Sequence, residues 1–272
     1  MAFIQENTIH IDLGLSKTYT LIQFTDVHVV TYDLTSDDHQ AIEKAKENER
    51  IWKQLRLDFA KKYNDTYDSN ILLSSKDCLK HLIDYTNSSS PDLVLLTGDI
   101  IDYYSPSNYD YLKKSVKNLS SPYVFSCGNH ETPSEHFDSI CKENCDYSQF
   151  EFDDFIVISL NNSNRKIKSS QLNNLKMTLG KEKPILLAMH IPIMTSYNQH
   201  EFSQLDDYFS MKYNGCDAVT TEFIQLVSTS DLIKAVFCGH IHGSLISKIA
   251  PHKHQYCCSS GLIGHVNKII IK

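Results

Sequence analysis

The chain contains little glycine and little proline, nine and seven residues among 272. No internal repeat and no low-complexity linker divides it, so we expect a single domain over residues 1–272.

No apolar run approaches the roughly 20 residues that span a bilayer, and no membrane partner is therefore expected. The N-terminal segment lacks the basic and apolar regions of a secretory signal, which predicts a cytoplasmic location.

Positive charge is not in surplus either. The chain has 26 basic and 33 acidic side chains, which gives a formal net charge of -7. A protein that binds nucleic acid through a broad face needs clustered lysine and arginine, so nucleic acid is disfavoured as a partner. The sequence leaves the oligomeric state open.

The eight cysteines include no Cys-x-x-Cys pair. We interpret them as buried free thiols rather than as a disulfide framework, because most of them lie within apolar segments. Histidine, in contrast, is abundant with 13 residues, and neutral imidazole is the commonest metal ligand in proteins. The cysteines in apolar segments are Cys127, Cys216, Cys238, Cys257 and Cys258.

Five short apolar runs are each followed at once by polar residues that can bind a metal ion. Such runs, when bounded by turn residues, are typical of strands that are buried on both faces. Between several of them, residues 74–86, 108–119 and 169–179 have apolar positions at helical spacing. This alternation predicts a layered α/β fold. The polar residues after the runs are Asp26 and His28, then Asp99, then Asn129 and His130, then His190, and finally His240 and His242.

These polar residues are expected to meet at one edge, because ligands of α/β sheets collect at the carboxyl ends of strands. A glycine directly precedes Asp99, Asn129 and His240, and we expect it to supply the sharp turn that points each side chain out of the sheet. His240 and His242 are two residues apart, so on an extended segment they would face opposite sides and bind different ions. They would bind one ion if the backbone bends.

The donor atoms are oxygen and imidazole nitrogen without thiolate, a mixture that suits manganese, iron or zinc. Two ions a few ångströms apart need a shared anionic bridge, and Asp99 is the best candidate for it. Each motif alone has a structural explanation, since Asp26 with His28 could cap a helix and Asn129 could begin one. Taken together and in order, the motifs favour a metal site.

The ordered set Asp-x-His, Gly-Asp, Gly-Asn-His-Glu, His and Gly-His-x-His resembles the calcineurin-like metallophosphoesterases. The resemblance runs from Tyr19 to His242. It implies a four-layer αββα sandwich, with two mixed β-sheets flanked by helices, around a centre of two metals. The chain departs from the family pattern at Glu131, where aspartate is more common, and at Ile241, where threonine is frequent.

Within this family, the block Pro91–Asp99 and the compact length look most like the bacterial cyclic-nucleotide and glycerophosphodiester phosphodiesterases. Asp102 is followed by Tyr103 and Tyr104, and the Arg-Gly that follows in serine/threonine phosphoprotein phosphatases is absent. The resemblance therefore does not extend to that branch.

The resemblance also implies a role for each motif residue. The cofactors would be two metal ions, Mn²⁺, Fe²⁺/Fe³⁺ or Zn²⁺. His130 would contact the scissile phosphate, and Asp102 would orient His130. The first ion would be bound by Asp26, His28 and His242 and the second by Asn129, His190 and His240, with Asp99 bridging the two.

The expected reaction is hydrolysis of a small phosphoester, in which a hydroxide that bridges both ions attacks phosphorus in line. His130 would stabilise the charged transition state or protonate the leaving alkoxide. A phosphodiesterase is the first expectation. The alternatives are a phosphomonoesterase or nucleotidase of the same fold, and a non-catalytic metal-binding scaffold.

Residues 35–68 and 195–221 look like insertions, and each follows a candidate metal ligand. They could form walls or lids of the site, or they could pack elsewhere as solvent-covered helices and loops. We interpret the lysine-rich residues 44–62 as a solvated helix face. Residues 245–272 alternate apolar and polar positions, which predicts antiparallel strands or a hairpin that closes the second sheet.

Overall fold

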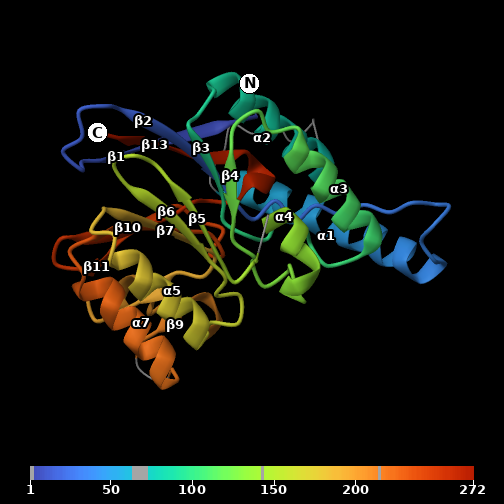
Figure 1. Cartoon of the computed structure of the whole chain (residues 1–272). Coiled ribbons are helices and arrows are strands. Elements are labelled where there is room, and N and C mark those ends of the chain that lie inside the picture. Colours follow the sequence, from blue (N-terminus) through green and yellow to red (C-terminus); the bar gives the residue numbers. More distant parts are fainter. Residues whose placement is uncertain (1–2, 63–72, 142–143, 214–215) are drawn as a thin grey trace.

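The computed structural model describes residues 3–62, 73–141, 144–213 and 216–272. Two large mixed β-sheets lie face to face, and helices cover the outer side of each (Figure 1). The first sheet has the strand order β1-β13-β2-β3-β4, and the second has the order β11-β12-β10-β7-β6-β5. The predicted four-layer αββα sandwich is confirmed.

Most strand pairs are parallel, as expected where helices cover the outer faces. In the first sheet only β13 and β2 pair antiparallel, and in the second sheet the edge strands β11 and β5 do so. A separate short pair consists of β8 (Ile193–Met194) and β9 (Met211–Lys212). The strands of the two sheets are β1 (Gln5–Ile11), β2 (Tyr19–Phe24), β3 (Leu93–Leu96), β4 (Tyr123–Phe125), β5 (Tyr147–Glu151), β6 (Ile156–Leu160), β7 (Ile185–Met189), β10 (Ile233–Cys238), β11 (Leu245–Ala250), β12 (Lys253–Cys257) and β13 (His265–Ile271).

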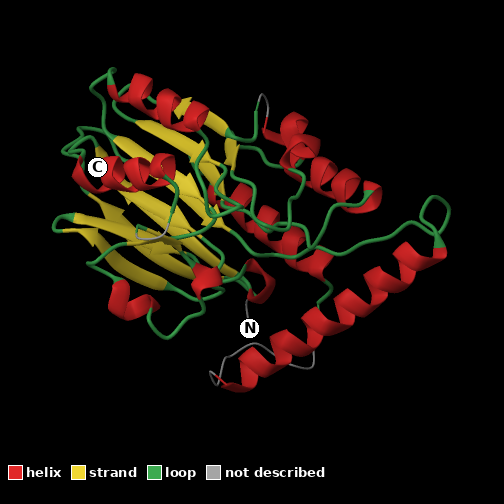
Figure 2. Ribbon diagram, turned by 90° about the horizontal axis from the view of Figure 1, so that it is seen from below, coloured by secondary structure: helices red, strands yellow, loops and turns green. Residues whose placement is uncertain are grey.

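Helices connect these strands and cover the sheets from outside. Figure 2 shows the strands grouped on the left and α1 as a long helix at the lower right, along the edge of the molecule. The α-helices are α1 (His39–Lys62), α2 (Ser75–Ser89), α3 (Pro106–Lys117), α4 (Asp138–Cys141), α5 (Ser169–Leu179), α6 (Gln199–Phe202) and α7 (Ala218–Thr229), and the short 3₁₀ helices are η1 (Ser134–Phe137), η2 (Asp207–Phe209) and η3 (Gly261–Ile263).

The apolar side chains form three layers because successive residues of a strand point to opposite faces. On β3, Leu93 and Leu95 pack between the two sheets, whereas Val94 and Leu96 pack against α2 and α3. The strands of the second sheet divide in the same way, with their outer residues packed against α5 and α7. Buried apolar residues on both strand faces are what the sequence predicted.

The predicted helices 74–86, 108–119 and 169–179 are α2, α3 and α5. Residues 245–272 contain the antiparallel pair β11–β12, as expected, but β13 belongs to the first sheet, where it pairs with β1 and β2. Several elements were not predicted from the sequence, among them the buried strand β6, the edge strand β5 and helix α7. The edge strand β5 has a largely polar, half-buried sequence, and α7 begins inside the segment 195–221.

The interpretation of all cysteines as free thiols is wrong for two of them. Cys141 and Cys145 form a disulfide, and their Cα atoms lie 5.1 Å apart, within the range that a disulfide spans. The other six cysteines are free.

Among the described residues, no helix combines the length and the apolar character that crossing a bilayer requires.

Candidate metal centre

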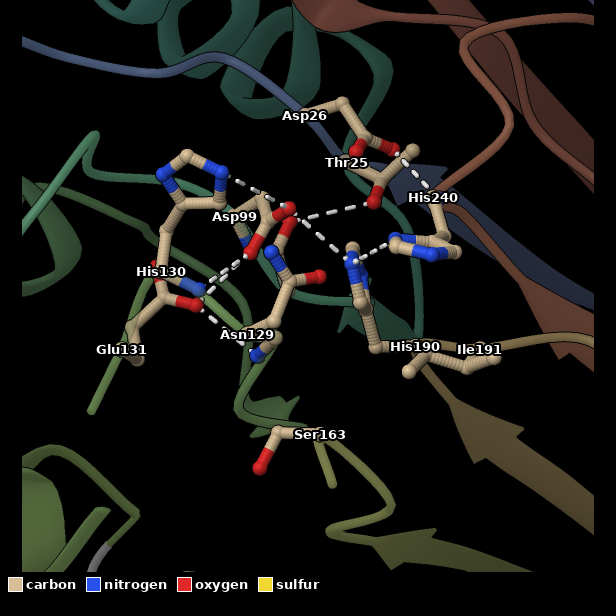
Figure 3. Close-up of polar contacts among 12 residues, drawn as sticks. Thr25, Asp26, Asp99, Asn129, His130, Glu131, Ser163, His190, Ile191 and His240 are labelled. Atoms are coloured by element: carbon tan, nitrogen blue, oxygen red, sulfur yellow. Dashed lines mark hydrogen bonds and ion pairs between the residues drawn. The ribbon is translucent and has the colours of Figure 1, made fainter. Parts of the chain in front are cut away.

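The predicted site residues come together where both sheets present the carboxyl ends of their strands. Three of the motifs follow β2, β3 and β4, which are neighbours in the first sheet, and two follow β7 and β10 in the second. The residues therefore converge from the edges of two facing sheets, rather than from one edge as the sequence suggested. Figure 3 shows Asp99, Asn129, His190 and His240 pointing toward one another.

Five site residues adopt the left-handed backbone conformation, which non-glycine residues rarely occupy. Their φ angles lie between 49° and 71°. Such strain persists only where the surroundings enforce it, and it concentrates at functional sites. Here the loops bind one another, since the amide of His28 donates to the Asp99 carbonyl at 3.0 Å. The five residues are Asp26, His28, Asp99, His240 and His242.

The glycines before the site residues mainly provide space, which differs from the predicted role. Of the three, only Gly98 has a positive φ, 89°. A Cβ atom at Gly128 would overlap the carboxylate of Asp99, and one at Gly239 would overlap the side chain of Thr25. Asp99 and His240 themselves have positive φ angles, 52° and 71°, and the glycines let neighbouring loops approach closely.

The first group of converging donors consists of Asp26, His28 and His242. The Nε2 atoms of the two histidines face each other at 3.0 Å, and His242 Nε2 lies 3.3 Å from Asp26 Oδ1. Ligands bonded to one ion at about 2.1 Å stand roughly 3 Å apart. The spacing of these donors therefore fits a single cation.

The second group consists of Asp99, His190 and His240. His190 Nε2 lies 3.0 Å from Asp99 Oδ2 and 3.1 Å from His240 Nδ1. Asn129 lies between Asp99 and His190 in Figure 3, and its Oδ1 atom is buried without a hydrogen-bond partner among the described residues. A buried amide oxygen without a partner is costly, and a cation would satisfy it. His240 and His242 thus serve different groups, although their backbone is not extended.

The site concentrates negative charge away from water. The side chains of Asp26, Asp99 and Asp102 are 0%, 2% and 4% exposed. In the described part of the chain, only histidines form ion pairs with them. Buried carboxylates without lysine or arginine partners require other cations, which are protons or metal ions.

The pKa values of the histidines reflect this charge. Burial opposes protonation of His190, but the neighbouring Asp99 carboxylate outweighs burial and raises the pKa of His190 to about 9. Burial and the nearby charge of His190 lower the pKa of His240 to about 4. Burial also opposes ionisation of Asp99, yet the contacts with His190 hold its pKa well below the usual range.

His130 lies beside these groups and is the most exposed histidine of the site, at 30%. Its Nδ1 atom contacts the carbonyl of Asp102 and lies 3.4 Å from the Asp102 carboxylate, while Nε2 lies 4.0 Å from Asp99 Oδ2. Burial lowers the pKa of His130, but the contacts with Asp102 and Asp99 prevail and raise it to about 10. Asp102 also lies 3.6 Å from His28 Nδ1, so it contacts two histidines of the site.

Sequence reasoning treated Glu131 only as a departure from the family pattern, but its buried carboxylate organises the Asp99 loop. Its oxygens accept hydrogen bonds from the amides of Asp99, Ile100, Ile101 and Gly128, at 2.7 to 3.1 Å. Burial and the charge of Asp99 raise the pKa of Glu131 to about 7, although these hydrogen bonds oppose the rise.

Asn162 is a second positioning residue that the sequence did not reveal. Its Oδ1 atom accepts hydrogen bonds from the amides of His190 and Ile191, and its Nδ2 atom donates to the Ile191 carbonyl. His190 Nδ1 in turn bonds to the Thr97 carbonyl at 2.7 Å. A histidine fixed in this way through its second nitrogen is typical of metal ligands.

Both suspected insertions contact the donor groups. Trp52 and Asn48 of α1 touch His28 and Asp102, and the Tyr208 carbonyl accepts a hydrogen bond from His240 Nε2 at 3.1 Å. Residues 63–68 of the first insertion and residues 214–215 of the second lie outside the described residues.

Residues 19–244 match the family model of the calcineurin-like phosphoesterases. The chain belongs to this family. The family predicted from the five ordered motifs is therefore confirmed.

Two curated relatives agree with the predicted branch. A probable cyclic nucleotide phosphodiesterase of Synechococcus sp. is 26% identical over 166 residues, which are 58% of this chain and 60% of the relative. A probable glycerophosphodiester phosphodiesterase of Arcobacter nitrofigilis is 25% identical over 183 residues, 61% of either chain. The matches thus span somewhat less than two thirds of these relatives.

Among solved structures, a dimetal phosphatase from Danio rerio shares the fold with a TM-score of 0.54 and 13% sequence identity. The alignment covers 90% of this phosphoesterase and 88% of the fish protein. Likeness at this level of identity supports the fold and not a shared substrate.

Proposed function

We propose that the chain is a metal-dependent hydrolase of phosphoester bonds and that it acts on small phosphodiesters. The observation that carries the proposal is the pair of donor groups, Asp26–His28–His242 and Asp99–His190–His240, with His130 beside them. The similarity to relatives named phosphodiesterases favours a diester over a monoester.

Each donor group would hold one metal ion. Asn129 would complete the second group through its unpartnered Oδ1 atom. Asp99 would bridge, because β3 lies between β2, which leads to Asp26 and His28, and β4, which leads to Asn129. Carboxylate, amide and imidazole donors suit manganese, iron or zinc. When bound, two such ions neutralise phosphate oxygens and make a water molecule a stronger nucleophile.

His130 would act on the substrate directly. Its Nδ1 atom donates to the Asp102 carbonyl, so Nε2 is the nitrogen that faces the donor groups. From there it can donate a hydrogen bond to a phosphate oxygen or a proton to the leaving alkoxide. Asp102 would be a positioning residue, because its contacts fix the ring of His130.

The direct test is turnover of bis-p-nitrophenyl phosphate and of p-nitrophenyl phosphate by protein loaded with Mn²⁺. We expect faster hydrolysis of the diester. Preference for the monoester would favour the phosphomonoesterase alternative, and protein that binds two ions without turning over either compound would contradict an enzymatic function.

The variant His130→Ala tests the proposed catalytic role. We expect turnover to fall by about 10²- to 10⁴-fold, as for the loss of a general acid, while both metal ions remain bound. His252→Ala, at an exposed residue beside β12, is the matched control. If the chain is a non-catalytic scaffold, the wild type and both variants will show no turnover.

A further inference from the structure

Helix α1 docks on the metal centre through one polar face. One side of the helix is formed by residues at positions i, i+3, i+4, i+7 and i+11, which are Ala45, Asn48, Glu49, Trp52 and Arg56. Ala45 and Arg56 on this side are buried, whereas Arg50 and Gln54 outside it are exposed. The interpretation of residues 44–62 as a solvated face is thus wrong for one side of the helix.

The aromatic contact on this face is made to a proposed metal ligand. The ring of Trp52 stacks on the ring of His28, with centroids 4.0 Å apart and planes inclined by 20°. Trp52 also lies 5.9 Å from the ring of His242, the other histidine of the same donor group. It contacts the first donor group, whereas the second is flanked by Tyr208 and Phe209.

Polar contacts from the same face reach the residues behind His28. Asn48 Nδ2 donates to Asp102 Oδ2 at 2.6 Å, and the Asp102 carboxylate lies 3.6 Å from His28 Nδ1. Glu49 accepts a hydrogen bond from Ser75 Oγ at 2.6 Å, and Ser75 Oγ accepts one from the amide of Val30. The helix thereby holds both the ring of His28 and the loop that follows it.

We propose that α1 is a positioning element of the metal centre, in which Trp52 and Asn48 fix His28 and Asp102 and so strengthen metal binding by the Asp26–His28–His242 group. The proposal rests on the proposed metal centre. A stacked ring blocks rotation of the imidazole and excludes water from its face. Residues that orient metal ligands typically change metal affinity by about 10- to 100-fold when they are replaced.

The first experiment uses the fact that Trp52 is the only tryptophan, so that its fluorescence reports this contact alone. Co²⁺ is titrated into metal-free protein while tryptophan emission and bound Co²⁺ are measured. We expect strong quenching by the ion that binds beside His28, and its loss in His28→Ala. Two bound Co²⁺ ions without quenching would overturn the proposal and leave the proposed hydrolase standing.

The second experiment measures both Co²⁺ dissociation constants in Trp52→Ala, Trp52→Phe and Asn48→Ala, with Gln54→Ala on the exposed side of α1 as the control. Far-UV circular dichroism verifies folding. We expect Trp52→Ala and Asn48→Ala to weaken one ion by about 10- to 100-fold and leave the other unchanged, with partial recovery in Trp52→Phe.

Other outcomes separate this proposal from the proposed function. Unchanged affinities in Trp52→Ala and Asn48→Ala, or equal weakening of both ions, would overturn the role of α1 only. Wild-type protein that binds none of Co²⁺, Mn²⁺, Fe²⁺ and Zn²⁺ would overturn the metal centre and this proposal together.

Discussion

At the scale of single residues, the metal centre depends on more than the proposed ligands. It also depends on buried side chains that accept hydrogen bonds from the backbone amides of the loops carrying those ligands. Glu131 accepts four amide hydrogen bonds from the segments that carry Asp99 and Asn129. An amide left unpaired in this buried place would cost about 1–3 kcal/mol. Glu131 therefore keeps the strained Asp99 loop in place from a buried position.

We expect Glu131→Gln to destabilise the fold by about 1–3 kcal/mol for each amide that loses its acceptor, and to lower the metal content. Glutamine retains one carbonyl oxygen, and its NH₂ group would face amides that also donate. Urea denaturation and elemental analysis would measure both effects. Glu135→Gln, at an exposed residue four positions along the chain, should change neither quantity.

The close approach at Gly128 gives a second prediction at this scale. A methyl group in Gly128→Ala would overlap the Asp99 carboxylate, so we expect the variant to displace Asp99 and to lose metal. In Gly243→Ala the new methyl group would meet nothing nearer than 3.7 Å, and metal content should stay at the wild-type value. Equal metal content in the two variants would contradict the idea that Gly128 leaves room for the Asp99 carboxylate.

The convergence of the proposed ligands was predictable from the sequence, because each lies within four residues of the end of a strand. Glu131, Asn162 and Trp52 were not predictable, because their roles depend on which loops become neighbours in space. Sequence spacing places Glu131 near Asn129, but only the fold brings its carboxylate to the amides of the Asp99 loop.

At the scale of elements, apolar spacing predicted the helices whose docked side is apolar. It predicted α2 because Leu79, Leu82 and Ile83 face the first sheet. It did not predict the docking of α1, because that helix attaches through Asn48, Glu49 and Trp52 rather than through an apolar stripe. On a polar docking face, apolar residues do not recur at helical spacing. The sequence alone therefore cannot distinguish such a face from a helix face that is exposed to solvent.

The end of α7 offers a prediction with a pH dependence. Lys253 of β12 is 7% exposed, and its ammonium group donates to the carbonyls of Val227 and Ser230 at this end. Burial lowers its pKa to about 8, whereas an unfolded lysine titrates near 10.4. Between these values the unfolded chain binds more protons, so the contribution of Lys253 to stability should rise with pH.

Lys253→Met isolates this contribution. We expect the free energy of unfolding of the wild type, measured relative to that of the variant, to increase from pH 7 to pH 10. Lys248→Met, at an exposed residue of the neighbouring strand β11, is the control and should give a difference that is nearly independent of pH. A constant difference for Lys253→Met as well would refute the lowered pKa.

At the scale of the whole molecule, the apolar layer between the sheets joins two halves that each have a helix-covered outer layer. This middle layer combines Leu21, Leu93 and Leu95 of the first sheet with Leu186 and Phe237 of the second. Separating the sheets would expose both inner faces to water. The metal centre depends on the same layer, because its ligands follow strands of both sheets.

We therefore expect the chain to unfold in one transition, as a single domain. Leu186→Ala in the second sheet should lower the free energy of unfolding by about 2–5 kcal/mol. It should also lower the urea midpoint reported by Trp52, which lies on α1 and stacks on His28 of the loop that follows β2 in the first sheet. Tryptophan fluorescence and far-UV circular dichroism in urea would follow the two parts, with Met177→Ala, an exposed position of α5, as the control. If the sheets were independent domains, Leu186→Ala would lower the urea midpoint measured by circular dichroism but not the midpoint measured by Trp52 fluorescence. The reason is that the proposed energetic coupling runs only through the layer between the sheets and the metal centre at its edge.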